Sequence, residues 1–424
     1  MSEPRALSVL MVSVGWPAET FIASSISSLA QAGVDLCVAI SLKPGQVLPG
    51  PTAFRCVALP SWNQHPARKL AILALMFFRK ATAHPRATAR LARLIRRRDD
   101  APSRVRAWFR LLPFVGLRPD ILHFQWNSSA IDYGVLFEFF ACPAIVSCRG
   151  SQVQVAPHNP QRRASLLAGL GATFDKAAAV HCVASAIAES ARQYGLTPEK
   201  TVVIRPAVDL DLFQPGAVNP RARSEPLRIV TAATLTWVKD LERALNAVRD
   251  AVTRRAAVEF DIYGDGPDRQ RLLYTIQDLG LSSVARLHGR VSQIEWRNAL
   301  RRAHVFLLTS VSEGISNAAL EAMACGVPVV TTDCGGMREA VRDGVDGLVV
   351  PLRAHGAVAD RLLQLAGDED LRARLGHAAT ERVAERFALS VQTSEWVKLY
   401  ASLKERRRRP DSLTEPPTTR ASAA

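Results

Sequence analysis

The sequence lacks the features of secreted, zinc-binding or membrane-spanning proteins. Its seven cysteines include no CxxC pair and mostly lie in apolar runs, which disfavours a zinc site and predicts reduced thiols in a cytosolic protein. The start, MSEPRALSVLMVSVGW, has an acid before its apolar run and no basic segment, so we expect a first strand there and not a signal peptide. The longest apolar segment, Leu70 to Phe78, is about half the length that spans a bilayer.

Acidic residues are also scarce relative to basic ones. The chain has 39 Asp and Glu against 54 Lys and Arg, a formal net charge of +15. Such a surface attracts nucleic acid, acidic lipid headgroups or phosphorylated substrates, and charge alone does not choose among them. Hydrophobic residues make up 48% and charged residues 22%, which is typical of folded soluble proteins. A chain of 424 residues is long enough for two domains with a cleft between them.

Short apolar runs rich in β-branched residues alternate with amphipathic segments of helical length. This alternation predicts an α/β fold, a parallel sheet with helices on both faces, and it occurs twice along the chain. The first set of predicted strands comprises ALSVLMVSV, DLCVAI, DILHF, AIVSC, AVHCVA and KTVVIR; the second comprises LRIVTAATL, VEFDIYG, ARLHG, VFLLTS and VPVVTT. We therefore predict two doubly wound domains, 1–210 and 227–385, joined by a linker at 211–226, where Pro, Gly and Asn cluster.

Two segments do not follow this alternation. The insertion at about 65–118 is strongly basic, with twelve Lys and Arg against two acids between Arg79 and Arg118. It is compatible with amphipathic helices lying on an acidic membrane, and equally with a solvated helical insertion. The last segment, 404–424, is polar and contains Pro without any apolar period, so we expect a disordered tail.

The stretch VSEGISNAALEAMACG, from Val311 to Gly326, predicts a turn followed by a short helix after the buried strand VFLLTS. Ser316 or Asn317 can cap that helix. Ligands of open α/β sheets bind at the carboxyl ends of the strands, where helix N-termini present free N–H groups. The amides from Gly314 to Ala318 are therefore suited to a phosphate group.

Two carboxylates flank these amides, and a carboxylate beside a phosphate needs another role. Because a carboxylate only accepts hydrogen bonds, it binds sugar hydroxyls well. Glu321 could bind a ribose and Glu313 a sugar, which makes the composite ligand a nucleotide sugar. The alternative is that both acids are solvated or capping residues.

The longer stretch SEGISNAALEAMACGVPVVTTDCGGMREAVRDGVDGLVVP resembles the E-x7-E signature of retaining nucleotide-sugar glycosyltransferases of family 4. The resemblance extends over about residues 5 to 400, through AETFIASSISSLAQAGVDL, AIVSCRGSQ and FDIYGDGPDR. It implies the GT-B fold of two facing Rossmann-like domains with a cleft between them, and a C-terminal helix at 386–403 that returns to the N-terminal domain.

The resemblance also implies residue roles. Glu313 would contact the donor sugar and Glu321 the ribose, with the backbone at Gly314, Ile315, Ser316 and Asn317 near the sugar or phosphates. The family's G-R-L-x-x-x-K-G segment neutralises the diphosphate. Here Lys239 is kept, Thr234 stands where Arg is expected and Asp240 where Gly is expected. Arg205 or Arg290 could replace the missing cation.

A second departure lies at SCRGSQ, where the family commonly has H-G-x-D and this chain has Arg149 and Gln152. Arg149 could donate hydrogen bonds to hydroxyls or to the diphosphate and so compensate for Thr234. Gly15 corresponds to the loop that lets the donor phosphate and the acceptor approach closely, or it is an ordinary turn glycine. Val291 corresponds to the position that contacts the nucleobase. His123, at a strand end, could face the cleft or pack in the core.

The resulting prediction is a retaining hexosyltransferase that moves a sugar from a nucleotide diphosphate to a lipid-linked or saccharide hydroxyl, in surface polysaccharide or glycolipid biosynthesis. We expect no metal and no cofactor, because no DxD triplet suited to a divalent metal lies in a loop position and because the resembled family generally works without a bound metal. Docking on an anionic membrane, at the inner face of the cell membrane, is expected from the basic insertion. One alternative is a catalytically silent protein that binds a nucleotide or polyanion. Nucleic-acid binding is supported by charge alone, and a nicotinamide oxidoreductase is disfavoured because no complete glycine fingerprint is present.

Overall fold

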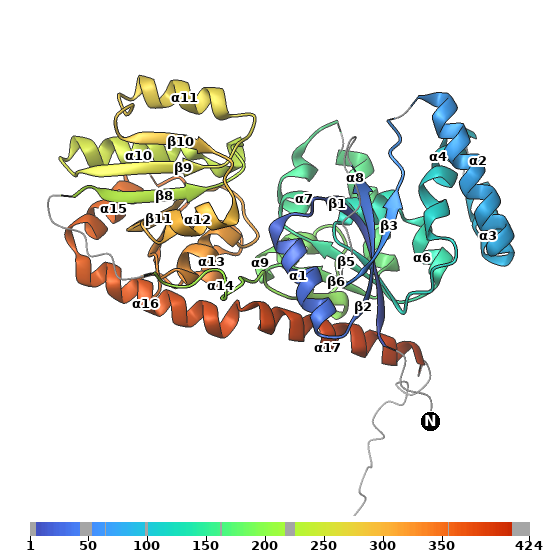
Figure 1. Cartoon of the computed structure of the whole chain (residues 1–424). Coiled ribbons are helices and arrows are strands. Elements are labelled where there is room, and N and C mark those ends of the chain that lie inside the picture. The colour runs from blue at the N-terminus through green and yellow to red at the C-terminus, as the bar shows by residue number, and fades with distance from the viewer. Residues whose placement is uncertain are drawn as a thin grey trace, which may run out of the picture.

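The computed structural model describes residues 6–42, 53–63, 65–97, 101–161, 163–216, 225–354 and 356–408. They form two α/β domains side by side, and two consecutive C-terminal helices run beneath them, the first under the C-terminal domain and the second under the N-terminal domain (Figure 1). Parts of three predicted segments lie outside the described residues: 98–100 of the basic insertion, 217–224 of the linker and 409–424 of the tail.

The N-terminal domain is built on a parallel sheet of seven strands in the order β3-β2-β1-β4-β5-β6-β7. Its strands are β1 (Ser8–Trp16), β2 (Asp35–Leu42), β3 (Arg55–Leu59), β4 (Ile121–Phe124), β5 (Ala144–Cys148), β6 (Ala179–Cys182) and β7 (Thr201–Val203). The central strands are buried on both faces, as expected of a parallel sheet covered by helices. The predicted strands of this half are confirmed, and β3 was not predicted. It is a half-exposed edge strand of five residues, so its apolar pattern is weak.

Helices on both faces of this sheet supply the rest of the N-terminal core. They are α1 (Thr20–Gln31), α5 (Asn127–Asp132), α6 (Val135–Phe140), α7 (Ser151–Gln154), α8 (Arg163–Lys176) and α9 (Ser185–Arg192), with η1 (Leu112–Phe114), η2 (Ala156–His158) and η3 (Pro198–Lys200). The basic insertion forms three further helices, α2 (Pro66–Ala83), α3 (Pro85–Arg96) and α4 (Ala101–Leu111). These three stand at the side of the domain, away from its partner domain (Figure 1).

The C-terminal domain has a parallel sheet of six strands in the order β10-β9-β8-β11-β12-β13. The strands are β8 (Leu227–Ala232), β9 (Val258–Tyr263), β10 (Ala285–Gly289), β11 (Val305–Leu308), β12 (Val329–Thr332) and β13 (Leu348–Val350). The helices are η4 (Trp237–Lys239), α10 (Leu241–Thr253), α11 (Arg269–Asp278), α12 (Gln293–Leu300), α13 (Asn317–Ala324), α14 (Met337–Ala340), α15 (Ala357–Gly367) and α16 (Glu369–Arg386). In both sheets the chain order reverses beside the first strand, which is where doubly wound folds bind ligands. The predicted fold class is confirmed.

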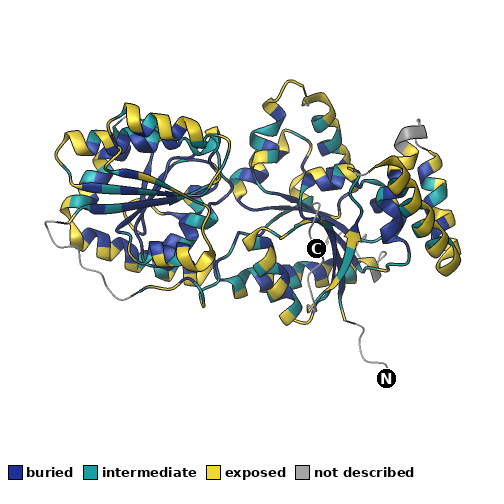
Figure 2. Cartoon of the chain, turned by 45° about the horizontal axis from the view of Figure 1, so that its top comes forward, coloured by how far each residue is buried: buried dark blue, intermediate teal, exposed yellow. Residues whose placement is uncertain are grey.

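The helix α17 (Leu389–Arg408) carries the chain back to the N-terminal domain. Its Trp396, Tyr400 and Leu403 belong to the buried cluster formed by β1, β2 and α1, and Figure 2 shows the dark buried layers inside each domain. Where the chain leaves the N-terminal domain, Val208 N–H donates to Phe387 O at 2.8 Å and Leu389 N–H donates to Val208 O at 3.0 Å. The two segments of the chain that pass between the domains are therefore hydrogen-bonded to each other.

The helix extends further than its predicted end at residue 403. Lys404 to Arg408 are helical, so the predicted tail begins too early. Lys, Glu and Arg are good helix formers, and nothing before Pro410 prevents helix continuation.

Candidate functional site

A cleft of about 1040 Å³ lies between the two domains at the carboxyl ends of both sheets. Its N-terminal wall comes from the segments after β1 and β5, and its C-terminal wall comes from those after β8, β9, β10 and β11. The predicted site residues that line it are Gly15, Arg149, Thr234, Lys239, Arg290, Val291, Glu313, Gly314, Ile315, Ser316, Asn317 and Glu321. Residues predicted from separate motifs are thus gathered in one cavity.

The turn that carries Glu313 is fixed by close backbone packing. Gly335 has φ +53°, and a Cβ there would lie 1.7 Å from the Glu313 carbonyl oxygen. Gly314 faces the other domain, where a Cβ would lie 2.6 Å from Val183 Cγ2. The turn therefore fits between two surfaces only because both positions lack a side chain.

The helix α13 begins directly after this turn. The Ser316 side chain caps it by accepting a hydrogen bond from Ala319 N–H at 3.3 Å, so the predicted capping is confirmed for Ser316. The free amides of the first turn consequently lie along the cleft, where a helix N-terminus stabilises negative charge.

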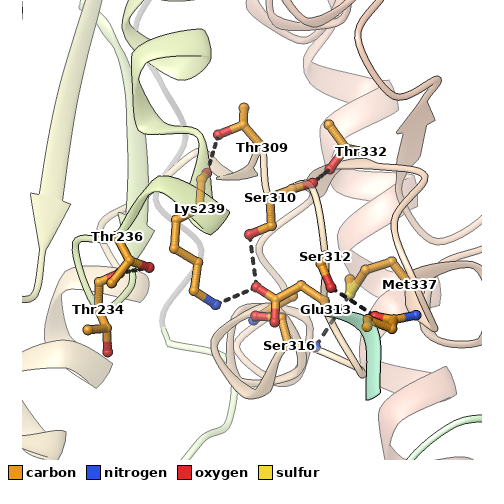
Figure 3. A network of polar contacts seen from close by, with 12 residues as sticks. Thr234, Thr236, Lys239, Thr309, Ser310, Ser312, Glu313, Ser316, Thr332 and Met337 are labelled. Carbon is orange, nitrogen blue, oxygen red and sulfur yellow. Dashed lines mark hydrogen bonds and ion pairs between the residues drawn. The ribbon is translucent and has the colours of Figure 1, made fainter. Parts of the chain in front are cut away.

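Lys239 and Glu313 form an ion pair in the cleft (Figure 3). Lys239 Nζ donates to Glu313 Oε1 at 2.5 Å, and Ser310 Oγ donates to the same oxygen at 2.8 Å. The backbone beneath Lys239 is held by Thr309, whose hydroxyl donates to the carbonyl oxygens of Lys239 and Asp240. The ammonium has three donors, so it can keep Glu313 and still bind an anion.

Asp240 occupies the position where the resembled family has glycine, and the backbone explains the preference. Its φ of +45° places it in the left-handed region, which glycine adopts without strain and aspartate tolerates. Its carboxylate accepts from Arg243 Nε at 2.7 Å, so it is neutralised and directed to α10. The substitution therefore leaves the local turn intact.

Glu321 lies in the second turn of α13 and is held by an aromatic residue from α12. Trp296 Nε1–H donates to Glu321 Oε2 at 2.8 Å. Burial raises the pKa of Glu321 to about 7. Among the described residues, no hydrogen bond is made to the second carboxylate oxygen, and Glu321 lines the cleft together with Ser292 and Val291, so it can accept from a hydroxyl ligand.

Replacing Glu321 with glutamine should stabilise the ligand-free protein at pH 8 and change its stability much less at pH 5. The folded-state pKa of about 7 lies above the usual 4.5. Between these values the folded chain holds a proton that the unfolded chain has released, so stability falls as pH rises. Above pH 7 the buried carboxylate costs up to about 3 kcal/mol, and glutamine removes this cost while still accepting from Trp296. Urea unfolding at both pH values measures the difference; a pH-independent effect would contradict the account.

Arg149 follows β5 and lies on the N-terminal wall of the cleft. Its Nε donates to Gln125 O at 3.1 Å and one terminal nitrogen donates to Gln125 Oε1 at 2.7 Å. The guanidinium stacks over Phe21 at 4.8 Å and Trp126 at 5.4 Å from the ring centroids. Burial lowers the pKa of Arg149 to about 10, so it is still protonated at pH 7. The guanidinium group of Arg149 is therefore fixed in one orientation, and its positive charge is available to a ligand.

The other residues predicted to bind the sugar donor also line the cavity. Gly15 has open space where its Cβ would be. Thr234, Arg290 and Val291 are exposed to the cavity. Their roles toward a ligand stay predictions.

Of the two alternatives for His123, the structure shows packing in the core and not a position facing the cleft. His123 is 1% exposed and lies beneath α17. Its Nδ1 is 2.8 Å from the Tyr400 hydroxyl and its Nε2 is 2.9 Å from Ser147 Oγ. Burial lowers its pKa well below the usual value. His123 is a packing residue that ties the returning helix to β4.

Arg205 does not replace the missing diphosphate contact either. Its guanidinium donates to Glu339 at 2.6 and 3.1 Å, outside the cleft lining. Glu339 also accepts from the backbone N–H of Ser185 at 2.6 Å. Arg205 and Glu339 therefore join the two domains at the first turn of α9.

Sequence reasoning missed Glu19, Gln125, Trp126 and Trp296. Glu19 and Trp126 line the cleft, and Gln125 orients Arg149. Glu19 and Gln125 each follow the end of a strand at the cleft edge, a position that could have marked them. Trp296 reaches Glu321 from a helix that no local motif identifies.

Within the part of the chain that the structure describes, no group of three or more His, Cys, Asp or Glu side chains could hold a metal ion. Metal independence stays a prediction, and chelator treatment of an active preparation tests it.

Comparison with known families follows the division into two domains. Residues 18–212 match the model described as Glycosyltransferase Family 4, and residues 218–382 match the model described as Glycosyl transferases group 1. The boundary between the two matches falls within the predicted linker.

Curated relatives match over part of their length. The chain is 35% identical over 203 residues to the putative colanic acid biosynthesis glycosyltransferase WcaL of Salmonella typhimurium, covering 46% of this chain and 50% of that protein. It is 32% identical over 229 residues to the D-inositol 3-phosphate glycosyltransferase of Streptomyces bingchenggensis, covering 50% of each. The chain thus spans about half the length of these relatives.

Solved structures show the same fold over nearly the whole chain. Sucrose-phosphate synthase from Thermosynechococcus elongatus has a TM-score of 0.73 at 19% identity, covering 94% of this chain and 99% of that chain. Anabaena HepE in complex with UDP-glucose has a TM-score of 0.66 at 16% identity, covering 93% and 100%.

Proposed function

The chain combines a Glycosyltransferase Family 4 domain with a Glycosyl transferases group 1 domain, and from this premise we propose that it transfers a sugar from a nucleotide diphosphate donor to an acceptor hydroxyl with retention of anomeric configuration. One observation supports this most strongly: Lys239, Glu313, the start of α13 and Glu321 line one cavity, so groups suited to a diphosphate, a sugar and a ribose are available to a single ligand.

Catalysis follows from where negative charge develops. As the bond to the sugar breaks, charge accumulates on the departing diphosphate. Lys239 and the amides of α13 stabilise it from the C-terminal domain, and Arg149 does so from the N-terminal domain. Glu313, which is paired with Lys239 and accepts a hydrogen bond from Ser310, also accepts hydrogen bonds from the sugar hydroxyls. Closure of the two domains excludes water and aligns the acceptor.

The acceptor we propose is a lipid-linked or saccharide hydroxyl in the synthesis of a surface polysaccharide or glycolipid. The names of the curated relatives, one of which concerns colanic acid, support a polysaccharide context. Proton NMR of the product formed from an α-linked donor tests the reaction. An α-linked product supports retention, and a β-linked product would contradict it.

A second candidate, a catalytically silent nucleotide-binding protein, is favoured by Thr234 at the position where a cation is expected. Under that alternative, nucleotide binds while no nucleotide sugar is consumed, neither by hydrolysis nor by transfer to mono- and disaccharide acceptors.

We also propose that the basic insertion docks on an anionic membrane. Among the described residues no helix is long and apolar enough to cross a bilayer. The helix α2 instead leaves an apolar face in solvent, with Leu70, Leu75 and Phe78 exposed by 63%, 61% and 70%, bordered by Arg68 and Arg79. An exposed apolar face beside cations is typical of helices that lie in the membrane interface.

A triple variant in which serine replaces Leu70, Leu75 and Phe78 is expected to be retained on phosphatidylglycerol vesicles at least tenfold more weakly. Each apolar side chain that leaves the membrane loses up to about 1.5 to 3 kcal/mol. Vesicle sedimentation measures this, and the matched control replaces Leu273, Tyr274 and Leu352, exposed on the other domain. Equal loss in both variants would contradict docking through α2.

A further inference from the structure

A second cavity, of about 690 Å³, lies in the N-terminal domain between α3, α6, the segment before β4 and the end of α17. The segment Leu117 to Asp120 precedes β4, whereas the cleft residues follow strand ends. Asp120 also accepts from Ser8 N–H at the start of β1, at 3.1 Å. This cavity is therefore at the amino edge of the sheet, opposite the edge that forms the cleft.

The lining of this cavity is strongly basic. It contains five cations and one acid: Arg86, Arg90, Arg118, Lys404, Arg407 and Asp120. They come from three segments that are distant in the sequence. We call this cavity the amino-edge pocket.

Little of this positive charge is neutralised by the protein. The one acid, Asp120, pairs with Lys404 at 2.8 Å. Arg90 donates to a backbone carbonyl, Glu138 O, at 2.7 Å. In the described part of the chain, Arg86, Arg118 and Arg407 form no ion pair. Like charges gathered around one hollow repel each other, and an anion that enters it relieves that repulsion.

The remaining lining is apolar and includes Leu117, Phe139 and Phe140. The two phenylalanine rings lie edge to face at 5.1 Å. Guanidinium groups bind phosphate oxygens through paired, charge-assisted hydrogen bonds, while the rings and Leu117 suit a carbon-bearing substituent. A bare inorganic ion would leave this apolar wall uncovered.

We propose that the amino-edge pocket is an anion-binding site, separate from the donor cleft, that takes a phosphate ester carried by an organic group. Two sources share this chemistry: a soluble ester such as a sugar phosphate, and the headgroup of an anionic lipid. Because Lys404 and Arg407 belong to α17, an occupied pocket also fixes the end of the helix that joins the two domains.

Calorimetric titration of the full chain with glycerol 3-phosphate, at low ionic strength and with glycerol as the blank, tests the proposal. Saturable binding is expected. A triple variant in which alanine replaces Arg86, Arg118 and Arg407 should have a Kd at least tenfold higher. A matched control replaces Arg286, Arg374 and Arg386, which are exposed and line neither cavity; its Kd should change less than twofold. Since the substituted side chains are exposed, folding should be unaffected, and Arg118→Glu alone repeats the test with one change.

Vesicles of phosphatidylglycerol distinguish the two sources. Loss of vesicle retention in the Arg86, Arg118 and Arg407 variant, beyond that of the control, assigns the site to a lipid headgroup; loss confined to glycerol 3-phosphate assigns it to a soluble ester. The proposal is overturned if neither probe binds, if both triple variants weaken binding equally, or if Lys239→Ala and not the pocket variant removes it. The α2 variant should still bind glycerol 3-phosphate, so failure of membrane docking and failure of this site remain distinguishable.

Discussion

Replacing Lys239 with alanine is expected to lower the rate of sugar transfer on the order of 10²-fold to 10³-fold, mainly in kcat. A preorganised donor aimed at developing charge is worth about this much, and an interaction that strengthens in the transition state affects kcat more than KM. Lys239 has a second effect here, because its removal leaves the Glu313 carboxylate, 12% exposed, beside the incoming diphosphate with only Ser310 as a partner.

Steady-state kinetics of four variants, Lys239→Ala, Glu313→Gln, the double variant and Lys239→Arg, separate the two effects. Glu313→Gln removes the carboxylate, so the double variant with Lys239→Ala should lose less activity than the two single losses combined. Lys239→Arg keeps the charge and should retain more activity than alanine. A Lys239→Ala enzyme with the kcat of the parent chain would contradict the assigned role.

Replacing Arg149 with alanine is expected to abolish turnover. The side chain is fixed by Gln125, Phe21 and Trp126 and its charge lies on the cleft wall that faces Lys239 and Thr234. Thr234 supplies no charge to the diphosphate, and we propose that Arg149 supplies it instead. Lysine at this position should restore little, because it lacks the planar fork that matches phosphate oxygens.

The exchange of roles between positions 149 and 234 can be tested directly. Arg149→His installs the residue common in the resembled family and should still be strongly impaired. Adding Thr234→Arg should then recover at least tenfold of the lost activity, whereas Thr234→Arg alone should gain little. Parent-like activity of Arg149→Ala, or no recovery in the double variant, would show that Arg149 does not compensate for Thr234.

The fold followed from local patterns in the sequence. Apolar runs such as VFLLTS and AIVSC are buried strands, and the amphipathic segments between them are helices, because burial on both faces of a parallel sheet imposes that pattern. The pattern weakens at exposed or very short strands, which is why β3 and the three-residue β13 were not predicted.

The cleft residues were predictable for a related reason. In a parallel sheet the segments after the strands meet at one edge, so Gly15, Arg149, Lys239 and Glu313 converge although they are distant in sequence. What the returning helix covers could not be predicted. His123 also lies near the carboxyl end of a strand, yet α17 buries it against Tyr400. Arg205 pairs with Glu339 across the domain boundary, a contact that depends on how the two domains pack.

We propose that the start of α13, with Lys239, Glu313 and Glu321, binds an activated sugar through its diphosphate. Thermal denaturation of the parent chain and of Lys239→Ala with UDP-, GDP- and ADP-sugars tests it most directly. One donor class should stabilise the parent chain, by about 2.7 kcal/mol at 100 times its Kd, and should stabilise Lys239→Ala much less at the same concentration. No stabilisation by any nucleotide sugar, or equal stabilisation of both proteins, would contradict it.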